Sequence, residues 1–170
     1  PEQIHVIESC APIVEELSGR GLSAVLTQPE LPAALDPEIV LFAVKPQSMD
    51  EAAPALAEYQ SPSTTFLSIA AGKTISYFEN ILGAKAAIVR SMPNTPAAVR
   101  RGITVATPNT NVTEAQCKIC GDLLAAVGDV AWVDDEGLID AVTALSGGGP
   151  AYVFLLTECM TQAGIDAGLP

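Results

Sequence analysis

The run Ile-Val-Leu-Phe-Ala-Val at residues 39–44 is apolar at every position. A strand of this kind has both faces covered, as in a parallel sheet with helices on either side. Other apolar, β-branched runs alternate with helical patterns along the chain, at 4–8, 22–26, 64–69, 86–90, 102–107 and 130–133. This alternation predicts an α/β fold, a Rossmann-type doubly wound parallel sheet.

The helical patterns between these strands lie at 12–17, 48–59, 74–82 and 113–127, with a short turn at 31–35. From residue 136 onward the pattern is helical only. We therefore divide the chain into a dinucleotide-binding region at 1–134 and the beginning of a helical domain at 135–170. The helix expected at 150–168 is apolar around most of its circumference, so it must be covered by a later segment or by a partner subunit.

Charge limits the partners of this chain. The net charge is −12, which repels nucleic-acid phosphates and anionic lipid. The longest apolar run near the C-terminus, at 151–156, is too short to span a bilayer. We therefore expect no nucleic-acid or membrane partner. Because 49% of residues are hydrophobic and only 16% are charged, we expect a homo-oligomer.

Four cysteines are present, at Cys10, Cys117, Cys120 and Cys159. Cys117 and Cys120 form a CxxC pair, but zinc needs a second pair of ligands and His5 is the only histidine. We interpret them as ordinary thiols and expect no metal. Scattered thiols without a signal peptide indicate a reducing cytoplasm.

Small or polar loops follow four of the predicted strands, at the carboxyl edge where open α/β sheets bind ligands. Glu8 and Ser9 end the first strand. A carboxylate there accepts both ribose hydroxyls of NAD and repels a 2′-phosphate, which favours NADH over NADPH. A solvated strand end explains Glu8 equally well. Lys45 precedes Pro46, and either faces a cofactor phosphate or ribose or is a solvated loop lysine.

Two further loops suit a nicotinamide ring. The small residues Ala70, Ala71 and Gly72 would let a flat ring approach the backbone, although a tight turn is the simpler explanation. Asn94 and Thr95 stand between two prolines, which makes a rigid polar loop able to orient a ring or its carboxamide.

The segment Ser146-Gly147-Gly148-Gly149-Pro150 is expected to open a helix, with the proline in its first turn. Glycines at a helix start allow an anion to reach free backbone N–H groups. Ser146, Gly147 and Gly148 are therefore candidate contacts for a substrate carboxylate. Close packing of two helices is an equal alternative.

Four motifs in order, at 43–47, 68–72, 90–97 and 140–152, resemble those of pyrroline-5-carboxylate reductase, and the resemblance covers essentially the whole chain. It implies reduction of 1-pyrroline-5-carboxylate to L-proline by NADPH or NADH, the last step of proline biosynthesis. It also implies a cytoplasmic enzyme whose helical domain forms a homodimer, with dimers assembling into a decamer. By the same resemblance, Ala43, Val44, Lys45 and Pro46, and Ile69, Ala70 and Ala71, contact the cofactor.

The sequence departs from the family pattern at several points. The Gly-rich turn after the first family strand and the later helices are not in this sequence, and we expect residues missing on both sides. In the strand order 3-2-1-4-5 the first strand is central, so the strands at 4–8 and 22–26 should lack a link to those at 39–44 and 64–69. Gly148 stands where the family usually has serine. The family often has serine or asparagine near Glu8 and Ser9, which leaves the choice of coenzyme open.

Hydride transfer to a protonated cyclic imine needs positioning more than acid–base catalysis, so we assign no catalytic residue. One alternative is a β-hydroxyacid-dehydrogenase-like oxidoreductase, but its chemistry needs a lysine that the helix at 150–168 does not have. A truncated, non-catalytic dinucleotide-binding or assembly protein is another.

Overall fold

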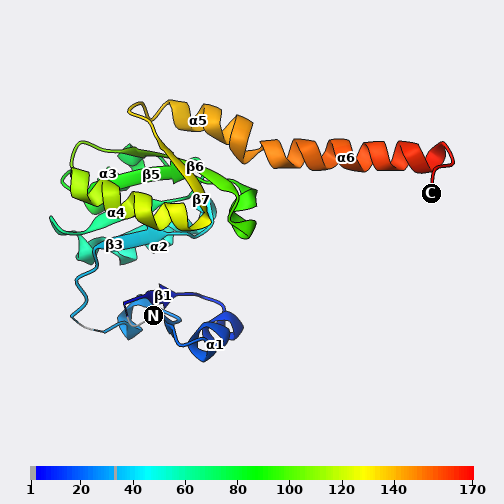
Figure 1. Cartoon of the computed structure of the whole chain (residues 1–170). Helices are drawn as coiled ribbons and strands as arrows, with labels where there is room; N and C mark the ends of the chain where they lie inside the picture. Colours follow the sequence, from blue (N-terminus) through cyan, green and yellow to red (C-terminus); the bar gives the residue numbers. More distant parts are fainter. Residues whose placement is uncertain (1–2, 33) are drawn as a thin grey trace.

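The computed structural model describes residues 3–32 and 34–170 and contains two separate sheets (Figure 1). The smaller sheet pairs β1 (His5–Ile7) with β2 (Ser23–Val25) in parallel, joined by α1 (Ala11–Gly19). The larger has the order β3-β4-β5-β6-β7. Its strands are β3 (Ile39–Phe42), β4 (Thr65–Ser68), β5 (Ala87–Met92), β6 (Gly102–Pro108) and β7 (Gly128–Trp132). The expected lack of pairing between the two groups of strands is confirmed.

The sequence predicts a parallel sheet, but the larger sheet is mixed. β3, β4 and β5 are parallel, but β6 runs antiparallel to β5, and β7 is parallel to β6. The cause is the short connection between β5 and β6, which contains only the 3₁₀ helix η4 (Thr95–Val99). A parallel crossover needs a dozen or more residues, so the chain turns back beside β5.

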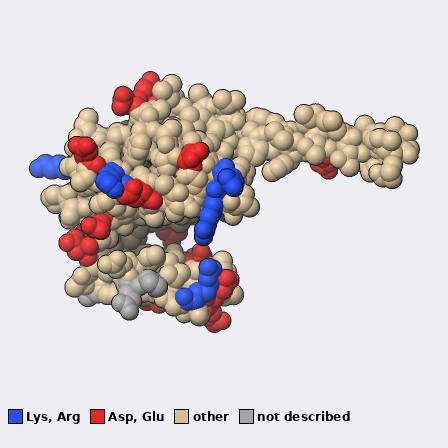
Figure 2. Space-filling view, in the orientation of Figure 1, with Lys and Arg blue, Asp and Glu red and all other residues tan. Residues whose placement is uncertain are grey.

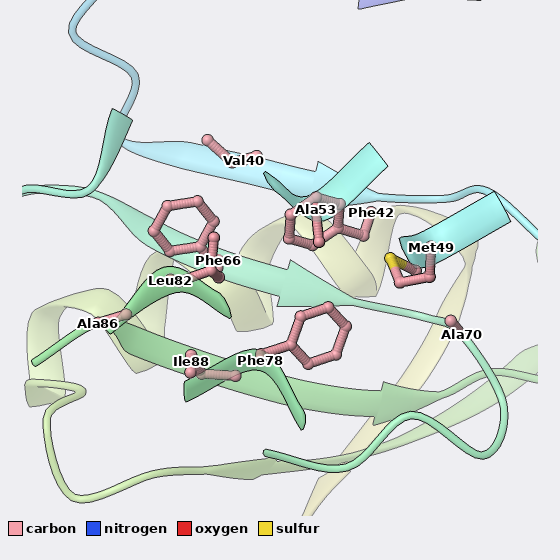
Figure 3. Close-up of a cluster of buried hydrophobic side chains, with 10 residues drawn as sticks. All are labelled: Val40, Phe42, Met49, Ala53, Phe66, Ala70, Phe78, Leu82, Ala86 and Ile88. Atoms are coloured by element: carbon pink, nitrogen blue, oxygen red, sulfur yellow. The ribbon is translucent and has the colours of Figure 1, made fainter. Parts of the chain in front are cut away.

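Helices cover both faces of this sheet, which confirms the doubly wound architecture. On one face, α2 (Met49–Ala55) and α3 (Ile75–Leu82) bury a cluster centred on Phe42, Phe66 and Phe78 (Figure 3). On the other face, α4 (Glu114–Leu124) packs Cys120 and Leu124 against alternate strand residues such as Leu67 and Val89. The alternation of Phe66 and Leu67 between faces follows from the two-residue repeat of a strand.

The expectation that β3 is covered on both faces is wrong. Val40 and Phe42 are buried, but Leu41 is 45% exposed. β3 lies at the edge of the larger sheet. The buried strand residues of the cluster under α4 come from β4, β5 and β6, and β3 adds only the partly buried Ile39. Leu41 pairs in register with Leu67, which is fully buried one strand further in.

Several helix boundaries differ from the sequence prediction. The helix expected at 48–59 is divided into α2 and the 3₁₀ helix η3 (Ala57–Tyr59), because Pro54 lies inside α2 and its ring lacks an N–H to donate. The turn expected at 31–35 overlaps residue 33, outside the described residues, and the helical turn in this region is η1 (Gln28–Glu30). The capping box of Thr113 and Gln116 is confirmed at the start of α4, which the 3₁₀ helix η5 (Ala125–Val127) extends.

The C-terminal helical segment is continuous rather than broken at the glycines. α5 (Leu138–Val142) leads through a π-helical turn, η6 (Thr143–Gly147), directly into α6 (Gly149–Asp166). Figure 1 shows α6 extending away from the sheet, and its large apolar side chains are exposed, with Phe154 at 67% and Leu155 at 61%. By length and composition alone, the helical stretch Leu138–Asp166 is apolar enough to cross a membrane. The length limit drawn from residues 151–156 therefore does not hold for the whole helix.

Candidate active site

Three of the predicted loops lie together at the carboxyl edge of β3, β4 and β5. The Ile69 N–H donates to the carbonyl of Phe42 at 3.2 Å, which joins the ends of β3 and β4. The Ser91 hydroxyl donates to the carbonyl of Ser68 at 2.9 Å, which joins the ends of β4 and β5. Because these three strands are parallel neighbours, the residues that follow them share one edge.

The loop after β4 leaves its backbone accessible. Ala70 is buried, with its N–H donating to the Ser68 hydroxyl at 3.2 Å, whereas Ala71 and Gly72 are exposed. Gly72 has φ +73°, and a Cβ added there would meet no atom within 4 Å. The open space and small side chains fit a flat ring lying against this backbone.

The loop after β5 holds Asn94 by a specific contact. Its Oδ1 accepts from the Ile103 N–H of β6 at 3.0 Å, which fixes the side chain and leaves Nδ2 as a donor. Thr95 begins η4 and is exposed. Arg100 closes η4 in the left-handed conformation at φ +58°. The loop is therefore positioned by the antiparallel return of β6, which sequence reasoning had missed.

The loop after β3 is exposed at Ala43, Val44 and Lys45. Lys45 has φ −60° and ψ 145°, the extended conformation expected before proline, and Pro46 begins the 3₁₀ helix η2 (Pro46–Ser48). The strand itself ends at Phe42, two residues before the predicted end. These exposed residues line the same edge as the loops of β4 and β5.

Glu8 and Ser9 belong to a different sheet from the three loops after β3, β4 and β5. They follow β1, which belongs to the smaller sheet. One carboxylate oxygen of Glu8 accepts from the Cys10 N–H at 2.9 Å, so the side chain folds over its own loop. The described residues do not join this loop to the edge of β3, β4 and β5 through a shared sheet.

Ser146 and Gly147 lie in the π-helical turn, and Gly148 follows it as the N-cap of α6. The predicted helix start with Pro150 in its first turn is confirmed, but a helix also precedes it, which the sequence did not predict. The Gly148 N–H donates to the carbonyl of Thr143 at 2.8 Å and is not free for an anion. A Cβ at Gly147 would lie 2.8 Å from Cε of Met92, so glycine permits close packing on the end of β5. Ser146 Oγ is buried without a hydrogen-bond partner within the described part of the chain. Single π-helical turns of this kind are frequent at functional sites.

Arg90 is a residue of this region that sequence reasoning missed. It lies in β5 with only 3% of its side chain exposed. Its Nη1 is 2.8 Å from the Glu136 carboxylate and its Nη2 is 3.0 Å from that of Asp140. Glu136 also accepts from the Ile75 N–H at the start of α3, at 2.8 Å. A charged residue inside the apolar run of β5 was the available signal, because a buried charge requires partners.

A second polar group missed from the sequence lies just after Gly72. Lys73 Nζ is 2.8 Å from the Asp50 carboxylate and 4.1 Å from the centre of the Tyr77 ring, and the Tyr77 hydroxyl donates to Asp50 at 2.6 Å. The hydrogen bonds from Lys73 and Tyr77 lower the pKa of Asp50. The bond to Asp50 raises the pKa of Lys73, and desolvation raises that of Tyr77. This group ties α2 to the loop before α3.

The cysteines behave as unreactive thiols where they are buried. Burial raises the pKa of Cys120 to about 11 and also raises the pKa of Cys117. Among residues 3–32 and 34–170, no three histidine, cysteine or acidic side chains gather in a way that could hold a metal ion.

Comparison with known proteins identifies the relatives of this chain. Residues 136–170 match the family model for pyrroline-5-carboxylate reductase dimerisation. The chain is 48% identical over 137 residues to the pyrroline-5-carboxylate reductase of Pseudomonas aeruginosa, a match of 81% of this chain and 50% of the relative. It is 39% identical over 143 residues to that of Haemophilus influenzae, with 84% and 53% covered. The resemblance to pyrroline-5-carboxylate reductases is confirmed.

Solved structures agree with these sequence matches. A pyrroline-5-carboxylate reductase from Coxiella burnetii superposes with a TM-score of 0.84 at 32% identity, over 97% of this chain and 61% of that one. The Plasmodium falciparum pyrroline carboxylate reductase with NADP bound gives 0.78 at 34% identity, over 88% and 55%. Prephenate dehydrogenase from Aquifex aeolicus, at 17% identity and a TM-score of 0.64, shares the fold alone. This chain spans about half the length of the curated relatives it matches.

Proposed function

We propose that the protein reduces 1-pyrroline-5-carboxylate to L-proline with NADPH or NADH, the last step of proline biosynthesis. The observation that carries this proposal is the identity of 48% with a pyrroline-5-carboxylate reductase, in a chain whose motif loops meet at one strand edge. Ligands of open α/β sheets bind outside the carboxyl ends of the strands, which is where these loops lie.

The proposed cofactor contacts divide between the two sheets. Ala43, Val44, Lys45 and Pro46 would face the ribose and phosphates, while Ile69, Ala70, Ala71 and Gly72 would lie against the ring. Asn94 and Thr95 would orient its carboxamide, with the free Nδ2 of Asn94 as a donor. Glu8 and Ser9 would contact the adenosine ribose. The open backbone at Gly72 supports this assignment, since a bulkier or closed turn would exclude the ring.

The substrate is proposed to bind between the end of β5 and the π-helical turn. When bound, the dihydronicotinamide supplies a hydride to the imine carbon. The chain's own part is to hold the two reactants in register, with Asn94 and Thr95 on the cofactor side and Ser146, Gly147 and Gly148 on the substrate side. The unpartnered hydroxyl of Ser146 is available to a carboxylate. A protonated iminium is already electrophilic, so no general acid is assigned.

The C-terminal helix is proposed to form a homodimer interface. Figure 2 shows α6 as an extension almost free of charged side chains, and residues 136–170 match a dimerisation family. A helix that exposes apolar side chains on all sides requires a covering partner, and a second copy satisfies that requirement. We further propose that the chain divides into a cofactor-binding domain at 1–134 and a helical domain at 135–170, and that dimers assemble into a decamer. We also propose a cytoplasmic location, which the free thiols support.

The function is tested with the protein at its natural length. We expect 1-pyrroline-5-carboxylate to cause loss of NADPH or NADH absorbance, with L-proline as the product identified by mass spectrometry. The matched control omits the substrate. An absence of turnover with both coenzymes would reject the proposed activity.

Coenzyme choice is tested at Glu8. Glu8→Ser is expected to raise the ratio of NADPH to NADH use by about tenfold, because one carboxylate facing a 2′-phosphate costs on the order of 1.4 kcal/mol. The control is Glu30→Ser, which removes a carboxylate from η1, after β2. A ratio that stays constant in Glu8→Ser would remove Glu8 from the coenzyme site.

A further inference from the structure

We propose that Arg90 is a positioning residue that sets the rotation of α5 and thereby the placement of the π-helical turn beside the reacting groups. This inference rests on the proposed function, because the turn carries the proposed substrate contacts. Arg90 would hold the helical segment against the sheet at the angle that the reaction requires.

Two apolar contacts anchor this helical segment to the sheet. Ile139 is 1% exposed and fixes α5 to the core, and Gly147 lies against the side chain of Met92 at the end of β5. Apolar burial is not directional, so these two contacts hold the segment on the sheet without fixing its rotation about the helix axis. A second kind of contact is needed to define that rotation.

The Arg90 guanidinium supplies such a contact. Its two terminal nitrogens bind two carboxylates, one just before α5 at Glu136 and one a turn later at Asp140. The planar guanidinium presents its donors in a fixed fork, so the two acids are held in a defined orientation. The Glu136 carboxylate also accepts a hydrogen bond from the Ile75 N–H, which holds the residue before α5 against the start of α3.

The orientation is transmitted to the π-helical turn through backbone contacts. The Thr143 hydroxyl donates to the carbonyl of Ile139 at 2.8 Å, and the Thr143 carbonyl accepts from the Gly148 N–H at 2.8 Å. Residues 139–148 are therefore one continuous hydrogen-bonded helical segment. A displacement of about 1 Å in groups that hold a reactant costs on the order of 100-fold in rate, so rotation of α5 has functional consequences.

The central test is Arg90→Lys, which keeps the positive charge but removes the fork. We expect the KM for 1-pyrroline-5-carboxylate to rise about tenfold while the KM for NADPH or NADH stays within about twofold, since the coenzyme loops are unchanged. A parallel rise of both constants, or an unchanged substrate KM, would overturn the proposal. A merely structural role for Arg90 predicts the parallel rise.

Asp140→Asn provides a second variant, because its side chain is 81% exposed and the change leaves no buried charge without a partner. We expect a rise of about threefold in the same KM. The matched control is Asp122→Asn, which removes one acid from the exposed pair with Lys118 and should leave both constants unchanged.

Amide hydrogen exchange separates this proposal from the proposed function. Exchange at residues 138–147 is expected to be about tenfold faster in Arg90→Lys than in the wild type, and unchanged in Asp122→Asn. If the wild type does not reduce the imine, the proposed function fails while the exchange result still tests the role of Arg90. Equal exchange in Arg90→Lys and the wild type would reject that role whatever the activity.

Discussion

Replacement of Phe78 by alanine is expected to lower the free energy of unfolding by about 3–5 kcal/mol. Phe78 is 1% exposed, and its ring is stacked 5.4 Å from that of Phe42, which is stacked in turn 6.0 Å from Phe66. Removal of the ring leaves a cavity between α3 and the sheet and takes away one member of the stack. Urea unfolding at fixed protein concentration measures the change.

The control for this prediction is Val99→Ala, at a side chain that is 71% exposed in η4. It should change the free energy of unfolding by less than about 0.5 kcal/mol. A loss below about 1.5 kcal/mol in Phe78→Ala would mean that the space between α3 and the sheet collapses around the smaller side chain.

Gly128→Ala is expected to disrupt the pairing of β6 with β7 and to cost about 3 kcal/mol or more. Gly128 pairs in register with Gly102 and has φ +149°. A Cβ there would lie 2.0 Å from the Gly102 carbonyl oxygen, a backbone atom that can yield only if the strand moves. The effect is measured by urea unfolding and by amide exchange along β7.

Gly83→Ala separates the steric clash from backbone strain. Gly83 also has a positive φ, +98°, but a Cβ there would meet no atom within 4 Å. Its substitution should cost about 1 kcal/mol, from the strained conformation alone. Equal losses in the two variants would show that the close approach to Gly102 contributes nothing to the effect at Gly128.

The strands were predictable because their apolar runs are short, β-branched and separated by turn residues. Each predicted strand is present to within two residues, and the fit is closest for β6, which differs from its predicted range at one end by one residue. The reversal of β6 was not predicted, although the nine residues between Met92 and Gly102 contained the information. An interval of that length cannot hold a crossover helix, so β6 must run antiparallel to β5. The amino-acid composition of the strands does not reveal this direction.

The candidate site was predictable as a set of loops but not as an arrangement. Residues after β3, β4 and β5 meet at one edge because parallel neighbours must place their carboxyl ends together. The π-helical turn was missed because glycines and a proline usually mark a helix start, and only the Thr143 carbonyl bond to Gly148 reveals the continuous helix. The acids that bind Arg90 lie just before α5 and within it, more than 40 residues later in the chain, and no local pattern relates them to Arg90.

The smaller sheet has a consequence for how this protein responds to denaturant. Among residues 3–32 and 34–39, none has a buried side chain, and Val40 is the first buried residue in the described part of the chain. Opening of β1 and β2 therefore uncovers little new surface, and the free energy of that opening should depend only weakly on urea concentration. Amide protons of β1 would exchange through this local event long before global unfolding. Glu8 thus lies on the part of the chain where a bound ligand would add most to local stability.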